Sequence, residues 1–201
     1  MNQTIKIALF ASGNGTNVQQ ISDYFLHRSH LHPEVDIVVD CVIYNRKDAF
    51  VAERAKTLGI ESFYINRTNF LQGETTLELL KKRNVDYIIL AGFLLLIPEY
   101  LLEAFPNRII NIHPALLPSY GGKGMYGHHV HEAVIANGEE ESGITIHLVD
   151  NQFDHGRMLF QAKVQISKED TADSLAEKIH LLEKTHFPLV IENYILDNIN
   201  K

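Results

Sequence analysis

The chain has 201 residues, 45% of them apolar, which suits one α/β domain with a real core. Lys and Arg number 18 against 25 Asp and Glu, giving a formal charge of −7, and no basic run occurs, so we expect no nucleic-acid partner. A single cysteine, Cys41, excludes an intrachain disulfide and suits a reducing compartment. No apolar run reaches the ~18 residues of a membrane span, and the N-terminus does not resemble a signal peptide. We therefore expect a cytoplasmic protein with no membrane partner.

Apolar runs alternate with helical patterns through the first half of the chain. Strands are expected at 5–12, 35–44, 61–65, 86–92 and 108–112. Helices are expected between them at 17–28, 48–59, 74–84 and 98–105. Asp48 and Gly59 fit as the N-cap and C-cap of the second helix. This alternation predicts an α/β fold with a mostly parallel, twisted sheet, helices on both faces and a Rossmann-like N-terminal half.

The pattern changes after residue 113. A helix is expected at 128–138, followed by strands at 142–150 and 158–166. About seven residues join these strands, too few for a parallel crossover, so the pair should be antiparallel and lie near the C-terminal part. A last helix is expected at 171–196, and Pro188 should kink or interrupt it.

The turn after the first strand reads "SGNGTN", residues 12–17. Gly13 and Gly15 allow a tight turn, and the helix that follows presents free N–H groups, so the turn suits an anion such as a monophosphate. Val18 stands where the dinucleotide fingerprint has its third glycine, and no Gly-Lys-Ser/Thr follows for a Walker A loop. An ordinary strand–helix turn with Asn17 as N-cap is the alternative.

Polar side chains interrupt the fifth predicted strand at its carboxyl end, where open parallel sheets bind ligands. Asn111 and His113 are two residues apart and so share one face of the strand, and Pro114 ends it. The amide can donate to a carbonyl oxygen, and the imidazole can exchange a proton near neutral pH. Asp154, in the loop between the last two strands, can orient that imidazole. This combination suits direct acyl transfer to an amine; the alternative is a satisfied histidine at a strand end.

Five motifs are distributed along nearly the whole chain: "SGNGTN", "AGFLLLIP", "NIHPALLPSY", "GITIHLVD" and "FDHGRMLFQAKV". Together they resemble the phosphoribosylglycinamide formyltransferases, folate-dependent enzymes of purine synthesis within the formyltetrahydrofolate transferase superfamily. The resemblance implies transfer of a formyl group from 10-formyltetrahydrofolate to the amine of glycinamide ribonucleotide, directly through a tetrahedral intermediate and without a metal. It also implies one domain, 1–201, with a phosphate-binding half to about residue 100 and a folate-binding, catalytic half after it. We expect a monomer or weak homodimer.

The family's site residues are transferred by position, and His147 matches a further family histidine near the site. The catalytic residues fall on Asn111, His113 and Asp154. The substrate-binding residues fall on Ser12, Gly13, Asn14, Gly15, Thr16, Asn17 and Glu183. The folate-binding residues fall on Leu94, Leu95, Leu96, Ile97, Asn111, Val149, Asp150 and Asp154.

The sequence departs from the family at basic positions. Gly73 stands where many members have an arginine that holds the substrate phosphate, and Leu95 stands where a basic residue often follows Ala-Gly-Phe. The loop after the proline motif, "SYGGKGMYGHHVHEAV", is longer than in many members, and the usual Asp-x-Gly-Pro reads "DHGR". Lys123 and Arg157 are therefore candidates for the missing positive charge.

Two histidine clusters, "HRSHLH" at 27–32 and "GHHVH" at 127–131, lack an accompanying cysteine or carboxylate set. His128 and His131 have ligand-compatible spacing on a helix, yet we expect solvated or loop-packing histidines and no metal.

Other functions share parts of this pattern. Formyltetrahydrofolate deformylases carry an extra N-terminal domain, and methionyl-tRNA formyltransferases an extra C-terminal RNA-binding domain, and we expect neither here. Sugar-nucleotide formyltransferases usually lack the phosphate turn. A non-catalytic nucleotide-phosphate binder is the alternative outside enzymes.

Overall fold

The computed structural model describes residues 3–28 and 34–199. The chain divides into two compact units, Met1–Ile110 and Asn111–Lys201. The expectation of a single domain stays a prediction. Two histidines of the 27–32 cluster, His30 and His32, lie outside the described residues.

Parallel strands form the sheet of the first unit, in the order β3-β2-β1-β4-β5. β1 pairs in parallel with β2 and β4, and β2 with β3, as the alternating pattern predicted. These strands are formed by the apolar runs of the sequence. Side chains on both faces of β1 are buried in its interior. The strands are β1 (Gln3–Ala11), β2 (Val35–Tyr44), β3 (Glu61–Tyr64), β4 (Tyr87–Leu90) and β5 (Ile109–His113), whose last three residues open the second unit.

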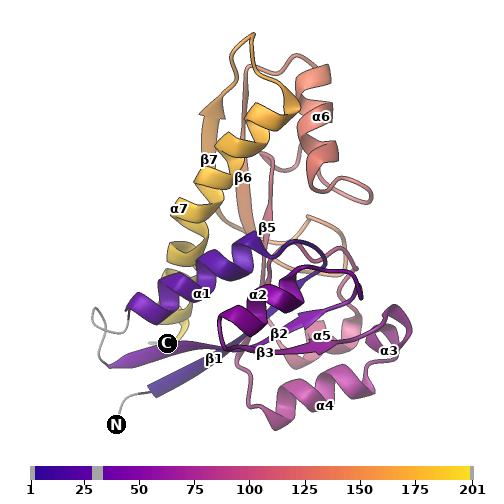
Figure 1. The fold of residues 1–201 in the computed structure, drawn as a ribbon, viewed down its shortest axis with the longest axis vertical. Helices are drawn as coiled ribbons and strands as arrows, with labels where there is room; N and C mark the ends of the chain where they lie inside the picture. Colours follow the sequence, from indigo (N-terminus) through magenta and orange to yellow (C-terminus); the bar gives the residue numbers. More distant parts are fainter. Residues whose placement is uncertain (1–2, 29–33, 200–201) are drawn as a thin grey trace. The chain divides into compact units, whose positions relative to one another are not determined.

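Helices cover both faces of this sheet. α1 and α2 lie on one side of β1, β2 and β3, and α4 lies on the other (Figure 1). Edge-to-face contacts of Phe70 with Phe10 and Phe93 fill the interior. The helices are α1 (Thr16–Arg28), α2 (Val51–Thr57), α3 (Arg67–Gln72), α4 (Glu74–Lys82) and α5 (Glu99–Ala104).

Local details of this unit differ from the sequence expectations. α2 begins at Val51, and Asp48 does not cap it because its carboxylate pairs with Arg46 at 3.1 Å. α1 begins at Thr16, so Asn17 lies inside the helix, and the N-cap that the alternative of an ordinary strand–helix turn assigned to it is not formed. α3 was not predicted; Asn66 caps it by accepting from the N–H of Asn69 at 2.9 Å.

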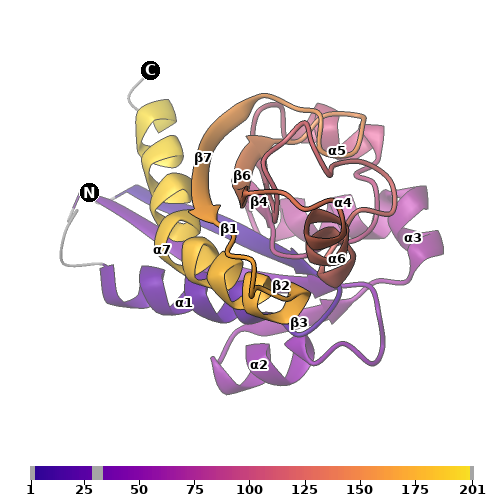
Figure 2. The same ribbon diagram turned by 90° about the horizontal axis from the view of Figure 1, so that it is seen from above.

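The second unit holds the end of β5 and an antiparallel pair, in the order β5-β6-β7. β6 (Glu141–Leu148) pairs antiparallel with β7 (Met158–Gln165), which confirms the prediction from the short connection. Helices α6 (His128–Ala136) and α7 (Ala172–Ile199) contact each other, and α7 runs beside β7 (Figure 2). α7 continues through Pro188, which is buried, so the predicted interruption does not occur.

Across the described ranges, 3–28 and 34–199, none of the helices combines the length and apolar character needed to span a membrane.

Candidate functional site

The turn after β1 packs against the start of α2 within the first unit. Gly15 has φ of 80°, and a Cβ atom there would lie 2.5 Å from Cγ2 of Val51. The N–H of Val51 donates to the carbonyl of Gly13 at 3.1 Å. α1 begins at Thr16, directly after the turn, so its first N–H groups lie at the turn. This construction suits an anion, and binding of a phosphate at the turn stays a prediction.

Arg54 of α2 brings a positive charge to the same turn. Its Nε donates to the carbonyl of Asn14 at 2.8 Å, and its Nη2 donates to Oδ1 of Asn14 at 2.6 Å. The guanidinium also lies 5.3 Å from the ring centroid of Phe50. Sequence reasoning did not select Arg54, because an arginine on an amphipathic helix gives no signal of its tertiary partner.

Ser12 ties the turn to the segment that carries the predicted folate residues. Its hydroxyl donates to Oδ1 of Asn45 at 2.6 Å and accepts from the N–H of Leu94 at 2.9 Å. Ser12 is buried, whereas Gly13 and Asn14 are exposed. The hydroxyl of Ser12 is therefore committed to holding the first unit together.

The structure explains why no side chain stands at Gly73. Its φ is 93°, and a Cβ atom would lie 2.9 Å from the ring of Tyr100, whose hydroxyl donates to the carbonyl of Phe70 at 2.7 Å. An arginine at this position would have to displace that ring. Within the described part of the first unit, the cation bonded to the turn is Arg54.

The three predicted catalytic residues meet in the second unit. Asn111 and His113 come from β5, and Asp154 comes from the loop between β6 and β7. One oxygen of Asp154, Oδ2, lies 3.4 Å from Nδ1 of His113. Its other oxygen, Oδ1, accepts from Nδ2 of Asn111 at 3.4 Å. The residues thus form one cluster, and their catalytic roles stay predictions.

Burial and charge act in opposite directions on this cluster. Burial lowers the pKa of His113 and outweighs the carboxylate of Asp154 and the carbonyl of Tyr120, which raise it. Burial raises the pKa of Asp154, but contact with His147, the charge of His113 and the N–H of Gly122 outweigh burial and hold the pKa below its usual value. Asp154 is therefore a carboxylate at neutral pH and favours a protonated imidazole beside it.

His147 of β6 fixes the amide of Asn111. Nδ1 of His147 lies 2.8 Å from the carbonyl of Leu148, which can only accept, so Nδ1 carries the proton. When His147 is neutral, its Nε2 then accepts from Nδ2 of Asn111 at 3.1 Å. The amide hydrogens of Asn111 thus face His147 and Asp154, and donation to a substrate oxygen requires exchange of one of these bonds.

The loop between β5 and α6 completes the cluster. Nε2 of His113 lies 2.7 Å from the carbonyl oxygen of Tyr120, and the N–H of Gly122 donates to Oδ2 of Asp154 at 3.0 Å. Tyr120 and Asp154 both have left-handed backbones, with φ of 57° and 54°. This conformation is uncommon for residues with a side chain and concentrates at functional sites. Neither contact could be predicted from sequence, because both use backbone groups of a glycine-rich loop.

The predicted folate residues divide between the units. In the first unit, Leu94 and Leu96 are exposed apolar side chains at 37% and 39%, whereas Ile97 is buried. In the second unit, Val149 is half-buried, and Asp150 pairs with Nδ1 of His155 at 2.7 Å. Binding of a folate at these residues stays a prediction.

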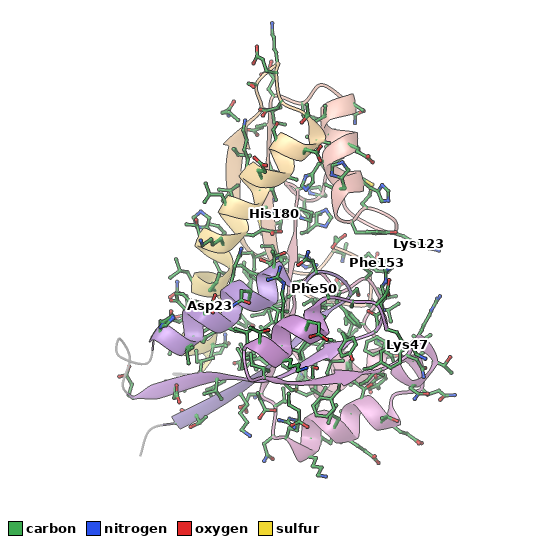
Figure 3. All side chains as sticks on the ribbon, viewed as in Figure 1. Asp23, Lys47, Phe50, Lys123, Phe153 and His180 are labelled. Atoms are coloured by element: carbon green, nitrogen blue, oxygen red, sulfur yellow. The ribbon has the colours of Figure 1, made fainter. Side chains whose placement is uncertain are left out.

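Three further charged candidates belong to the second unit. Glu183 is buried in α7, with 8% of its surface exposed. Lys123 projects from the loop before α6 (Figure 3), and Arg157 is exposed at the end of the loop between β6 and β7. Their predicted contacts with substrate stay predictions.

The histidines of α6 have separate environments. His128 and His129 are exposed and pair with Glu132 at 3.7 Å and 3.3 Å. His131 is buried, its Nδ1 has no hydrogen-bond partner among the described residues, and burial lowers its pKa to about 4. Within residues 3–28 and 34–199, no three His, Cys, Asp or Glu side chains are placed to hold a metal ion together.

The known proteins that are similar to this chain include several formyltransferases. A family profile described as formyl transferase matches residues 5–191. The chain is 34% identical to phosphoribosylglycinamide formyltransferase of Bacillus subtilis, over 94% of each protein. It is 35% identical to the crystal structure of phosphoribosylglycinamide formyltransferase from Streptococcus pneumoniae, with a TM-score of 0.81 over 95% of this chain and 99% of that one.

Similarity extends to plant proteins of greater length. The chain is 40% identical, over 87% of its length, to the Arabidopsis thaliana protein named phosphoribosylglycinamide formyltransferase, chloroplastic. It spans 60% of that protein and 60% of its Vigna unguiculata counterpart.

Proposed function

The chain belongs to the formyl transferase family, and we propose that it transfers the formyl group of 10-formyltetrahydrofolate to the amine of glycinamide ribonucleotide, a step of purine synthesis. The relatives with this activity in their names match most of the chain, and the Bacillus subtilis relative matches over 94% of its own length. The family membership supports a formylated folate as donor, and the relatives' names support the ribonucleotide as acceptor.

The observation that carries the proposal is the contact of Asp154 with both Asn111 and His113 in one buried cluster. It combines an amide donor, an imidazole and a carboxylate without a serine or cysteine nucleophile. Such a set suits transfer from one nitrogen to another with no covalent enzyme intermediate.

In the proposed reaction the neutral amine attacks the formyl carbon, and a tetrahedral species forms with a negative oxygen and a positive nitrogen. Protonated His113 stabilises the oxygen, with a hydrogen bond from Asn111, and Asp154 stabilises the imidazolium. The carbon–nitrogen bond to the folate then breaks. The attacking nitrogen loses one proton and the folate nitrogen gains one, through water near Asp154, so protons balance without a metal.

Substrate binding follows the placement of charge and apolar surface. We assign the ribonucleotide phosphate to the turn 12–17, with Arg54 beside it, because the turn has the anion-binding construction. Glu183 is assigned to the amino end of the ribonucleotide. The folate is assigned to Leu94, Leu95, Leu96 and Ile97 in the first unit and to Asn111, Val149, Asp150 and Asp154 in the second.

The proposal also covers partners and location. Small molecules are the expected partners, with no nucleic acid or membrane, and the protein acts as a monomer or weak homodimer. The buried free thiol of Cys41 supports a reducing compartment, for which we propose the cytoplasm.

The test measures consumption of 10-formyltetrahydrofolate with and without glycinamide ribonucleotide. Donor loss only when the ribonucleotide is present supports the proposal. Equal loss in both reactions indicates a deformylase. Binding of either compound with no donor loss indicates a nucleotide-phosphate binder, and use of another amine indicates a different formyltransferase.

A further inference from the structure

Tyr120 is fixed at both ends within the second unit. Its hydroxyl donates to Oε1 of Glu139 at 2.6 Å and accepts from Nδ2 of Asn137 at 2.8 Å. These partners follow directly after α6, whereas Tyr120 belongs to the loop before it. The side chain therefore ties the start of the loop to the end of the helix.

The backbone of the same residue faces the imidazole. The carbonyl oxygen of Tyr120 lies 2.7 Å from Nε2 of His113, and its φ of 57° is unusual for an aromatic residue. A carbonyl can only accept, so this contact requires a proton on Nε2. On the other side of the ring, Nδ1 faces the carboxylate of Asp154 at 3.4 Å, which also only accepts. The protonated imidazole is the form that donates to both.

We propose that Tyr120 is a positioning residue: its hydroxyl tether holds its carbonyl against His113 and keeps a proton on Nε2. The ring then enters the reaction with a proton on Nε2, and donation to the formyl oxygen requires exchange of the bond to the Tyr120 carbonyl for one to the substrate. This inference rests on the proposed function for the role of His113. Without the tether, a neutral His113 carries its proton on Nδ1 and donates a hydrogen bond from there to the carboxylate of Asp154.

Two further titratable side chains lie near His113 and act on its charge. Besides Asp154, these groups are His147 of β6, which lies against Asp154 at 3.7 Å, and His131 of α6. Both histidines disfavour a positive charge on His113 when they are protonated themselves. Among the residues that the structure describes, two contacts stabilise the charged ring, the carbonyl of Tyr120 and the carboxylate of Asp154.

The experiment compares Tyr120→Phe with Tyr126→Phe in protein carrying nitrogen-15 histidine. Tyr126 belongs to the same loop, is 45% exposed and packs edge-on against His129, so its hydroxyl serves as a matched control. Nuclear magnetic resonance of the ring nitrogens reports tautomer and titration, with the His113 signals assigned by their loss in His113→Asn.

In Tyr120→Phe, we expect the titration midpoint of His113 to fall and the neutral ring to shift from the Nε2–H to the Nδ1–H tautomer. We expect kcat to fall about three- to tenfold, the effect of losing one ordinary hydrogen bond, with little change in either KM. Tyr126→Phe should match the wild type in every readout.

Glu139→Ala breaks the tether from its other, exposed end and should reproduce the Tyr120→Phe spectrum, while Glu140→Ala, the adjacent exposed residue, should not. Unchanged His113 tautomer and titration in both Tyr120→Phe and Glu139→Ala would overturn the inference. Because the ring signals do not depend on turnover, a wild-type protein that transfers no formyl group would refute the proposed function and leave this readout intact.

Discussion

Replacing Asp154 with asparagine keeps the shape of the side chain and removes its charge. Asp154 Oδ2 and His113 Nδ1 lie 3.4 Å apart, and the two side chains are 10% and 4% exposed. At an effective dielectric constant of ~20, charges at this distance interact by about 5 kcal/mol. At about 1.4 kcal/mol per decade, this sets an upper limit between three and four decades in rate. An acid–base group typically contributes at least ~10²-fold, so we expect kcat to fall by about two to three and a half decades.

Binding and folding should survive this change. An asparagine oxygen can still accept from the N–H of Gly122, which now donates to Asp154 at 3.0 Å. The turn 12–17, which we propose binds the phosphate, belongs to the first unit, so KM for glycinamide ribonucleotide should stay close to the wild-type value. Steady-state assays with both substrates varied, together with thermal melting, measure each of these quantities.

The pH dependence gives a second readout. Asp154 raises the pKa of His113, so its loss lowers that pKa further below the ordinary value. If the protonated imidazole is the active form, the limb of the kcat profile that declines with rising pH moves to lower pH. Asp173→Asn is the matched control, since that side chain is 92% exposed on α7. Wild-type kcat with an unchanged pH profile in Asp154→Asn would refute the reasoning.

Four further changes test other parts of the account. Asn111→Ala should lower kcat by roughly two to three decades, the usual cost of one oxyanion donor, and a near-normal kcat would remove it from that role. Gly15→Ala should raise KM for the ribonucleotide more than KM for the folate, because its Cβ would lie 2.5 Å from a neighbouring side chain; equal KM values in both proteins would contradict the assignment. Arg54→Lys should also raise KM for the ribonucleotide, because lysine cannot reproduce the two-nitrogen contact with the turn, while Lys56→Ala on the same helix should not. His131→Leu should reduce the loss of melting temperature as the pH falls from 6.5 to 4. The folded protein holds His131 with a pKa of about 4, whereas the unfolded chain takes up this proton already near pH 6.5, so protonation favours unfolding across this range. An equal loss of melting temperature in the wild type and the variant would contradict this.

Strand positions and the proximity of the catalytic candidates could be predicted because they follow from short periodicities. β2 covers Val35–Tyr44, the same residues as the apolar run. Alternation along a strand placed Asn111 and His113 on one face. The seven residues between the predicted strands 142–150 and 158–166 required an antiparallel pair, which β6 and β7 form. These inferences use neighbouring residues only.

Contacts that join distant segments could not be predicted in this way. The capping role expected for Asp48 fails because Arg46 pairs with its carboxylate. His131 is buried whereas the neighbouring His128 and His129 are exposed, a difference that the local sequence does not mark. The backbone contacts of Tyr120 and Gly122 with the cluster depend on the path of a glycine-rich loop, which has no periodicity. Arg54 likewise reaches Asn14 across forty residues of sequence.

The central claim is direct transfer of the formyl group between two nitrogens, and an isotope experiment tests it most directly. The donor carries carbon-13 in its formyl group, and the reaction with glycinamide ribonucleotide runs in water enriched in oxygen-18. The account predicts N-formyl ribonucleotide that contains the labelled carbon and no heavy oxygen, with one product formed for each donor consumed. Labelled formate in place of that product, or heavy oxygen in the product's formyl group, would contradict it.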